Sequence, residues 1–275
     1  MQINNNIPNY QSPYLEQNKT LEKIATGLAI NKASDNASVM AISDVLRTQA
    51  SGYTQALSNA NSAVASVQIA DQAMSEQSKI LDNVKEKLLQ ASNGTTSDAG
   101  REAIFKDIQG LMKNFDNIAS STNYNGQVLL QRTQDDKSAT DSMTFQVGNN
   151  DQDVIYSPQL QSNSSGVGLN DLLNKDASSF NADDARGFLS KVDDAIGTLN
   201  SFRSDMGSVQ NQLESSAINL LSQQTQTQIA QSELVGANIA QEIGNFDKQN
   251  VLSQVGAYVQ SQSNVTQQSV LRLLS

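Results

Sequence analysis

The sequence predicts a mainly α-helical fold, a long coiled-coil-like helical bundle formed by the N- and C-terminal halves of the chain, with a small central β-hairpin region. Three observations predict this fold class. Apolar residues recur about every 3.5 positions over two long stretches, which is typical of helices that share a seam. Only 37% of the 275 residues are hydrophobic and 5% are aromatic. The middle of the chain is rich in Ser, Asn and Asp.

The first long apolar stripe covers residues 42–91. In alternating steps of four and three, thirteen of its fifteen positions are apolar or aromatic, and the two exceptions are Gln49 and Gln77. Such a spacing keeps one seam facing a partner helix, and a helix of this length would be about 75 Å long. We expect Asn93-Gly94 to end the helix, because both residues tolerate the left-handed backbone conformation.

A second helix is predicted after Ser97-Asp98, which can cap it, and the turn signal at 123–126 closes it. Residues 143–160 contain two β-rich runs on either side of Gly148-Asn149-Asn150, which predicts a hairpin. The polar residues of 131–142 and 161–187 are expected to form loops.

The apolar stripe returns at Val192, becomes more polar beyond Ser216, and is followed by an amphipathic segment over 239–274. Some of the seam positions are expected to form the bundle core and some to contact other copies of the chain. The predicted assembly and coiled-coil seam consists of Ile42, Leu46, Tyr53, Val67, Met74, Leu81, Val84, Leu88, Ile104, Ile108, Leu111, Phe115, Val192, Leu199, Phe202, Met206, Val209, Leu213, Leu220 and Leu234.

The two ends of the chain carry apolar stripes but have little else to pack against. We expect these ends to become ordered only when other copies supply the missing surface, at an entropic cost that the new burial must exceed. The sequence therefore predicts self-assembly. The apolar residues expected to make these contacts are Leu21, Ile24, Leu28, Ile243, Phe246, Val255, Val259, Leu271 and Leu274.

Composition argues against several other classes of function. The net charge of −10 disfavours binding to nucleic acid or to an anionic membrane surface. Without Cys or His, the chain has no thiolate nucleophile, imidazole base or Cys/His zinc site. Acidic pairs such as Asp193-Asp194 are expected to be hydrated rather than catalytic. The sequence thus predicts a protein that is not an enzyme and needs no cofactor or metal, without membrane insertion or a cleaved signal peptide.

Residues 21–77 closely resemble the N-terminal region of bacterial flagellins, and residues 206–220 and 249–275 resemble the C-terminal region of that family. The N-terminal landmarks are Gly27-Leu28, Ile30-Asn31, Ala33 to Ala37, Ala41-Ile42, Leu46-Arg47, Asn59 to Asn61 and Gln68 to Asp71. The segment KILDNVKEKLLQAS (79–92) and the C-terminal tail are most similar to flagellins of the Campylobacter and Arcobacter kind.

The resemblance implies a subunit that is secreted through the flagellar type III apparatus and polymerises into the extracellular filament for motility. Its implied partners are many identical subunits, an export chaperone, the filament cap and the hook-associated proteins. Large outer domains are expected to be absent, because the central region, which projects into solvent in this family, is short here. The implied parts are an N-terminal inner-layer segment with a flexible connector (1–38), an N-terminal helical region (39–130), a central variable region (131–187), a long C-terminal helix of the middle layer (188–236) and a C-terminal inner-layer helix (237–275).

Two departures from the family pattern lead to further expectations. Pro8 and Pro13 lie where the family forms an inner-layer helix, and we expect proline to break that helix. In the region that an innate receptor recognises in many flagellins, the matching positions here are Asn83, Lys87 and Asp107. The first two differ from strongly recognised flagellins, so the resemblance predicts weak recognition by the receptor.

Two other functions are alternatives. One is a hook–filament junction protein, which shares the terminal architecture. The other is a secreted coiled-coil effector or adhesin that uses the same export route without polymerising, and the two N-terminal prolines favour it.

Overall fold

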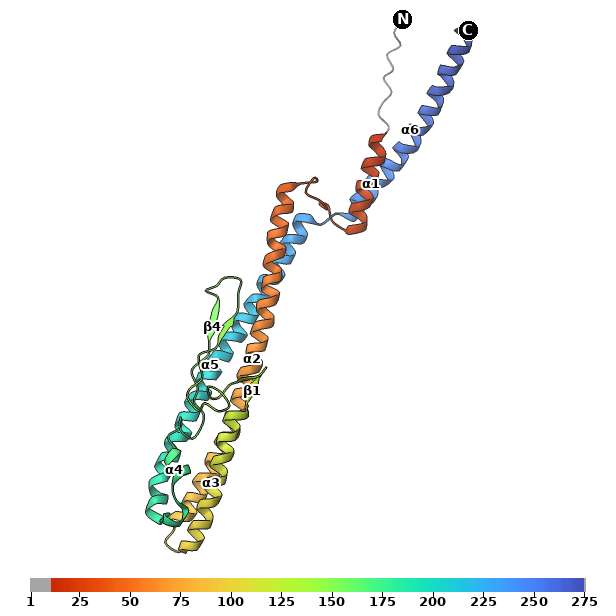
Figure 1. The fold of residues 1–275 in the computed structure, drawn as a ribbon. Coiled ribbons are helices and arrows are strands. Elements are labelled where there is room, and N and C mark those ends of the chain that lie inside the picture. Colours follow the sequence, from red (N-terminus) through yellow and green to blue (C-terminus); the bar gives the residue numbers. More distant parts are fainter. Residues whose placement is uncertain (1–10, 275) are drawn as a thin grey trace. The chain divides into compact units, whose positions relative to one another are not determined.

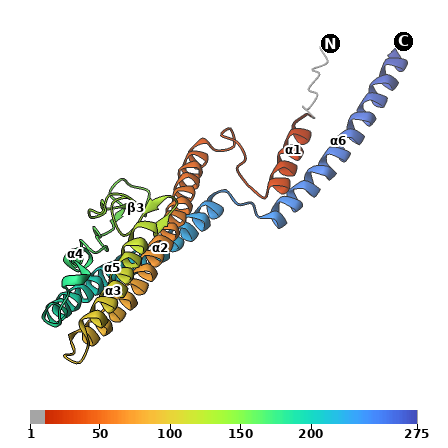
Figure 2. The ribbon, with the colours of Figure 1, turned by 60° about the horizontal axis from the view of Figure 1, so that its bottom comes forward.

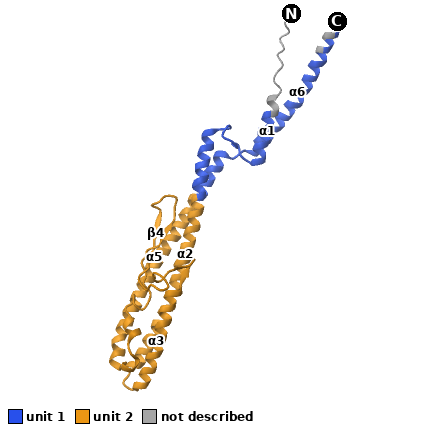
Figure 3. Cartoon of the chain, viewed as in Figure 1, with its two compact units in different colours: residues 1–51, 224–275 blue, residues 52–223 orange. Residues whose placement is uncertain are grey.

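The computed structural model describes residues 11–274, which form long helices and four short strands (Figure 1). The chain divides into two compact units, unit 1 (residues 1–51 and 224–275) and unit 2 (residues 52–223) (Figure 3). The predicted mainly α-helical fold class is confirmed. The elements are α1 (Gln11–Thr26), α2 (Ala37–Ser92), α3 (Asp98–Ser121), β1 (Asn123–Tyr124), β2 (Gln127–Val128), β3 (Thr144–Gln146), β4 (Val154–Tyr156), α4 (Asn170–Asn174), a 3-10 turn (Ala177–Ser179), α5 (Ala182–Val235) and α6 (Ile239–Leu274).

The core of unit 2 lies between α2, α3 and α5, which run side by side (Figures 1 and 2). In α2 the buried positions alternate in steps of four and three from Ala56 to Ala91, and in α5 the same alternation runs from Ala185 to Leu213 with Phe202 only half-buried. This confirms the period read from the sequence, because a mean spacing of about 3.5 residues keeps one stripe turned toward a neighbouring helix.

The buried face of α3 differs from the predicted one. Ile108 and Phe115 are fully buried as expected, whereas Ile104 and Leu111 are only half-buried. Their neighbours Phe105 and Met112 are fully buried instead. The ring of Phe105 stacks on Phe180, with the ring centroids 4.1 Å apart, so this side of α3 packs against the chain segment that precedes α5. A helix with contacts on two sides needs an apolar face wider than a single seam.

The end of α2 corrects another expectation. The helix does end at Ser92, but neither Asn93 nor Gly94 has a positive φ in the described chain. Side chains bind carbonyl groups at this end instead: Arg186 donates to the carbonyl of Ser92 at 3.4 Å, Arg101 donates to that of Asn93 at 3.1 Å, and Oγ1 of Thr96 donates to that of Gln90 at 2.9 Å. A cation near a helix C-terminus also interacts favourably with the helix dipole. At the start of α3, Ser97 is the N-cap, as predicted, and its Oγ accepts from the N–H of Gly100.

Two antiparallel hairpins follow α3. Strands β1 and β2 are joined by Asn125-Gly126, both with positive φ (52° and 81°), which is the turn chemistry expected of this dipeptide. Strands β3 and β4 pair Phe145 with Ile155, so the hairpin predicted within 143–160 is confirmed. The tip of this hairpin lies on α2: the side chain of Asn149 sits so close to Gly52 that a Cβ atom there would collide with it.

The central region does not form only loops, nor does it simply project into solvent. Residues 161–187 contain α4, the 3-10 turn and the start of α5 at Ala182. Many side chains of the region are buried in the core of unit 2, among them Leu160, Leu169, Leu172 and Phe180. The expectation was wrong because local polarity in a sequence does not reveal the apolar anchors spaced between polar residues.

In unit 1, α1 contacts α6. The expected break at Pro13 does not occur, since α1 begins at Gln11 and continues through Pro13 to Thr26. Proline is tolerated in the first turn of a helix, because the N–H groups there have no partner within the helix. The other proline, Pro8, lies outside the described residues.

Candidate assembly surfaces

The contact between α1 and α6 is small and partly polar. Thr20 of α1 is buried, and its Oγ1 donates to Oε1 of Gln249 at 3.1 Å. An ion pair joins Nζ of Lys23 to Glu242 at 3.8 Å. Most of the large apolar side chains that the structure describes on these two helices are exposed to solvent.

The exposed apolar residues of α6 follow a helical period. Five of them lie at relative positions 0, 1, 4, 7 and 8, which places them on one face of the helix. Their exposed fractions run from 47% for Val259 to 69% for Tyr258. We call this surface the terminal apolar face, and it consists of Val251, Leu252, Val255, Tyr258 and Val259.

The structure places the predicted contact residues of the two ends as follows. Leu21, Leu28, Ile243, Val255 and Val259 are exposed, and Ile24 and Phe246 are half-buried. The side chains of Leu271 and Leu274 lie outside the described ones. Contacts of the exposed residues with other copies remain a prediction.

Two connecting segments meet in unit 1. Leu28 and Gly236 form an antiparallel bridge, in which the N–H of Ala29 donates to the carbonyl of Val235 at 2.7 Å and that of Ala237 donates to the carbonyl of Gly27 at 2.9 Å. The segment after α1 and the segment after α5 are therefore tied together by main-chain hydrogen bonds. Gly27 enters this bridge with a φ of +71°, which favours glycine.

The segment that resembles a flexible connector contains a defined turn. One carboxylate oxygen of Asp35 accepts the N–H groups of Asn31 and Lys32, each at 3.1 Å. The bond from the Asn31 N–H, with help from that of Lys32, holds the pKa of Asp35 below its ordinary value of 3.8. Nζ of Lys32 forms an ion pair with Glu22 at 2.8 Å, and the pKa of Lys32 is raised by that contact.

The predicted seam residues divide into three groups. Leu46, Tyr53, Ile104, Leu111 and Phe202 are half-buried. Ile42 and Leu234 are exposed by 48% and 38%, so they do not belong to the core of the bundle within one chain. All others are buried, namely Val67, Met74, Leu81, Val84, Leu88, Ile108, Phe115, Val192, Leu199, Met206, Val209, Leu213 and Leu220.

At each of these two exposed positions, the next residue in the sequence is smaller and is the one that is buried. Ser43 is buried in place of Ile42, and Val235 is buried in place of Leu234. Nε2 of Gln231 donates to Oγ of Ser43 at 3.4 Å, so a polar contact accompanies this packing. The sequence contained one signal for this arrangement, namely small residues next to large apolar ones, which let two helix backbones approach closely.

The three residues that match the receptor-recognition region lie on α2 and α3, and two of them, Asn83 and Lys87, were predicted to weaken recognition. Asn83 is exposed. Nζ of Lys87 forms an ion pair with Oδ2 of Asp107 at 2.9 Å, so these two side chains already bind each other across the two helices. Arg47 forms an ion pair with Asp44 on its own helix at 2.8 Å.

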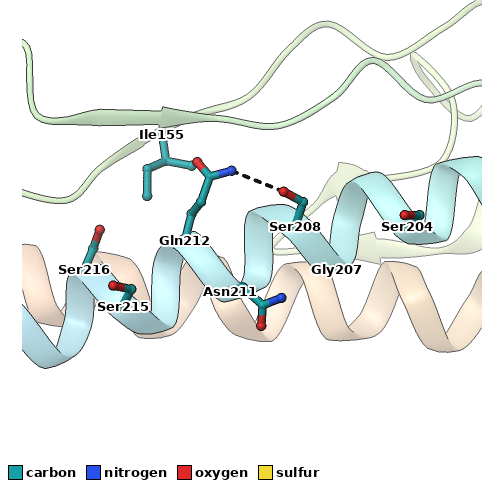
Figure 4. Close-up of a pocket in the computed structure, with 8 residues that line it drawn as sticks. All are labelled: Ile155, Ser204, Gly207, Ser208, Asn211, Gln212, Ser215 and Ser216. Atoms are coloured by element: carbon teal, nitrogen blue, oxygen red, sulfur yellow. Dashed lines mark hydrogen bonds between the residues drawn. The ribbon is translucent and has the colours of Figure 1, made fainter.

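The pocket in Figure 4 has no catalytic chemistry on its walls. It is an open space of about 820 Å³ between Ile155 of β4 and a row of small or polar residues on α5. Its lining contains no ionisable side chain, and its one drawn hydrogen bond runs from Gln212 to Ser208.

In the described part of the chain, no group of three or more acidic residues gathers to hold a metal ion. Among those same residues, no helix has the length and hydrophobicity needed to cross a membrane.

Comparison with known proteins adds independent findings. A family model described as the bacterial flagellin N-terminal helical region matches residues 1–135, and one described as the bacterial flagellin C-terminal helical region matches residues 189–274. The chain is 33% identical to flagellin FlaB1 of Treponema pallidum over 93% of this chain and 91% of that protein. It is 32% identical to a flagellin of Bacillus subtilis, with 100% of both chains covered.

A solved structure shares the fold. A chain of Vibrio parahaemolyticus, described as a flagellar hook-associated protein, aligns with a TM-score of 0.61 and 12% identity over 74% of this chain and 100% of that chain. At this identity the likeness concerns the fold alone, so it does not separate a filament subunit from a hook-associated one. The narrower resemblance to flagellins of the Campylobacter and Arcobacter kind stays a prediction.

Proposed function

The chain belongs to the bacterial flagellin family, and on this premise we propose that its copies assemble by covering one another's terminal apolar faces. It is a structural subunit of the flagellar filament, and its relatives support polymerisation. The observation that carries the proposal is the stripe of five apolar side chains on α6, each roughly half exposed or more in the single chain.

The free energy gained on assembly is estimated from the apolar surface that other copies would cover. Fully burying a Val or Leu side chain contributes about 1.5–3 kcal/mol, so covering the exposed half of one contributes about 1 kcal/mol. Five such side chains together provide a gain of several kcal/mol per copy, against which stands the cost of ordering and associating the chains. Within the described residues of one copy, these five side chains stay exposed, and the printed contacts of α1 with α6 are made at Glu242 and Gln249 instead.

We also propose that the subunit leaves the cell through the flagellar export route, held by a chaperone, and is incorporated beneath the filament cap next to hook-associated proteins. Two properties support this part. The chain contains no cysteine, so no disulfide must be broken for it to travel unfolded. The terminal apolar face is also a surface that a chaperone would have to shield before assembly.

The central test is polymerisation of purified protein onto filament fragments. Val255→Asp places a charge on the terminal apolar face, and we expect the critical concentration to rise at least about tenfold, which corresponds to about 1.4 kcal/mol. Gln254→Asp is the matched control, because it introduces the same charge at the neighbouring exposed position. If both variants polymerise like the parent protein, or if the parent does not extend the seeds, the proposal is wrong.

Weak recognition by the innate receptor is a separate proposal. It is supported by the exposed Asn83 and by the ion pair that engages Lys87 and Asp107 within the chain. A reporter-cell assay with purified monomer should give a response well below that of a strongly recognised flagellin. A full-strength response would contradict it.

A further inference from the structure

Three consecutive polar residues of the central region are completely buried. Ser162, Asn163 and Ser164 each have 0% exposure, although the sequence around them predicted a hydrated loop. Buried polar groups are almost always hydrogen-bonded, since leaving one without a partner costs the full desolvation penalty. The partners of these three side chains therefore show what holds this part of the chain.

Ser162 is bound by Gln77, one of the two residues that interrupt the apolar stripe of α2. Gln77 is 0% exposed, and its Nε2 donates to the carbonyl of Ser162 at 2.6 Å and to that of Phe115 at 3.1 Å. In return, Oγ of Ser162 donates to Oε1 of Gln77. A single side chain of α2 thus contacts both the central region and the backbone of α3.

Ser164 is bound by Asp116 of α3. One carboxylate oxygen of Asp116 accepts the N–H of Ser164 at 2.7 Å, and the other accepts Oγ of Ser164 at 2.9 Å. Nζ of Lys137 donates to the same carboxylate at 2.7 Å. Between these two anchors, Nδ2 of Asn163 donates to Gln131 at 3.1 Å and to the carbonyl of Lys137 at 2.7 Å.

We call the three residues Ser162-Asn163-Ser164 the polar key. We propose that the hydrogen bonds of the polar key to Gln77 and Asp116 fix a single position of residues 129–169 on α2 and α3. The apolar anchors of this segment, such as Leu130 and Leu160, are attracted to the helices without directional preference. The polar key adds that preference, because a shift of one residue would leave several buried polar groups without partners. The inference does not rest on the proposed assembly.

The competing explanation is that apolar packing alone positions the segment and that the polar contacts only fill space. The two explanations differ in what the loss of Gln77 does. Under the proposal, the segment opens locally while the helices remain packed. Under the alternative, the segment opens no more easily than the unit as a whole unfolds.

Thiol labelling of the full-length monomer separates these outcomes, because the chain has no cysteine of its own. Val167→Cys places a reporter in the segment, where Val167 is 5% exposed, and Ala185→Cys places a second reporter in α5, where Ala185 is 0% exposed. In the Gln77→Leu background we expect labelling at position 167 to accelerate about tenfold or more, with labelling at position 185 changed less than twofold.

Gln109→Leu is the matched control. Gln109 also lies on a helix and donates to two loop carbonyls, those of Leu173 and Lys175, but it is half-buried and outside the polar key. We expect labelling at position 167 to stay within twofold of the parent in this variant. Unchanged labelling at 167 in Gln77→Leu, or equal acceleration at 167 and 185, would overturn the proposal.

A second variant keeps the test decisive if Gln77→Leu does not fold. Ser162→Ala removes only the hydroxyl, and we expect about a threefold to tenfold acceleration at position 167. Where both single variants fold, the double variant should be less affected than the product of the two single effects, because both remove the same interaction. Independent, multiplicative effects would contradict a shared role.

Discussion

The two compact units use the same kind of helix in opposite ways. In unit 2, α2 and α5 turn large apolar residues such as Met74 and Leu199 inward to 0% exposure. In the described part of unit 1, most buried positions are small or polar, such as Ser43 and Ala50, while Ile42 and Val45 are exposed. This contrast shows that the spacing of apolar residues alone does not predict whether a helix packs within its own chain or against another copy. Unit 2 has its core within one chain, whereas many large apolar side chains in the described part of unit 1 are exposed, and we propose that other copies cover them.

The largest expected effect is on the stability of the monomer, which a truncation in the core of unit 2 should lower far more than a truncation in unit 1. Phe115→Ala should lower the free energy of unfolding by about 3–5 kcal/mol, because Phe115 is fully buried in unit 2. Val255→Ala in unit 1 should change it by less than about 0.5 kcal/mol, since its side chain is half exposed. Denaturant titration of both variants checks this, and similar losses in the two would remove the distinction between the units.

The next effect concerns assembly rather than folding. Tyr258 is the most exposed member of the terminal apolar face, at 69%. Tyr258→Ser should raise the critical concentration for seeded polymerisation about 10- to 30-fold and leave the denaturant midpoint of the monomer unchanged. Sedimentation of seeded reactions at several concentrations measures it. A shift in the monomer midpoint without a change in assembly would reverse the assignment of this residue.

A smaller effect is expected from the ion pair between α2 and α5. Nε of Arg203 donates to Asp71 at 2.8 Å, and this contact raises the pKa of the guanidinium. Both side chains keep more than a third of their surface in water, so solvent screens the pair. Asp71→Asn should therefore cost at most about 1 kcal/mol of unfolding free energy. Asp82→Asn, an exposed position on the same helix without an ion pair among the described residues, is the control.

The smallest effect is local and depends on pH. Because the pKa of Asp35 is lowered in the folded chain, the turn at residues 31–35 gains stability above the ordinary value of 3.8. That stability is lost as the pH falls through the lower, folded value. An NMR titration should show the amide resonances of Asn31 and Lys32 shifting together in acid, and Asp35→Asn should abolish the transition. An unchanged transition in that variant would assign it to another group.

Much of the fold of unit 2 could be predicted from the sequence, because the buried residues of its long helices recur at a regular spacing. The stripe from Val67 to Leu88 was read correctly, since a heptad spacing leaves one physically sensible face. Ile42 and Leu234 are exposed in one chain, so their contribution to a seam between copies stays a prediction. Hydrophobicity marks a surface that will be buried without showing whether the same chain or another one buries it. The adjacent small residues were the signal that the core within one chain would not include these two positions.

The polar key could not have been predicted from local sequence. Ser162, Asn163 and Ser164 have the composition of a hydrated loop, and their partners Gln77 and Asp116 lie far away along the chain. The prediction for the end of α2 was wrong for a related reason. A local rule predicted a left-handed turn at Asn93-Gly94, whereas Arg101 and the more distant Arg186 bind two of the carbonyl groups at this end. Non-local hydrogen bonds decide both places, and no periodic pattern records them.

Amide hydrogen exchange, measured on the monomer and on assembled filaments, tests the central claim most directly. We expect the amides of α6 around Val255 to exchange rapidly in the monomer and to slow at least about tenfold in the filament, while those around Leu81 in α2 are protected in both states. Slow exchange throughout α6 in the monomer, or no slowing on assembly, would contradict the account that identical copies complete unit 1.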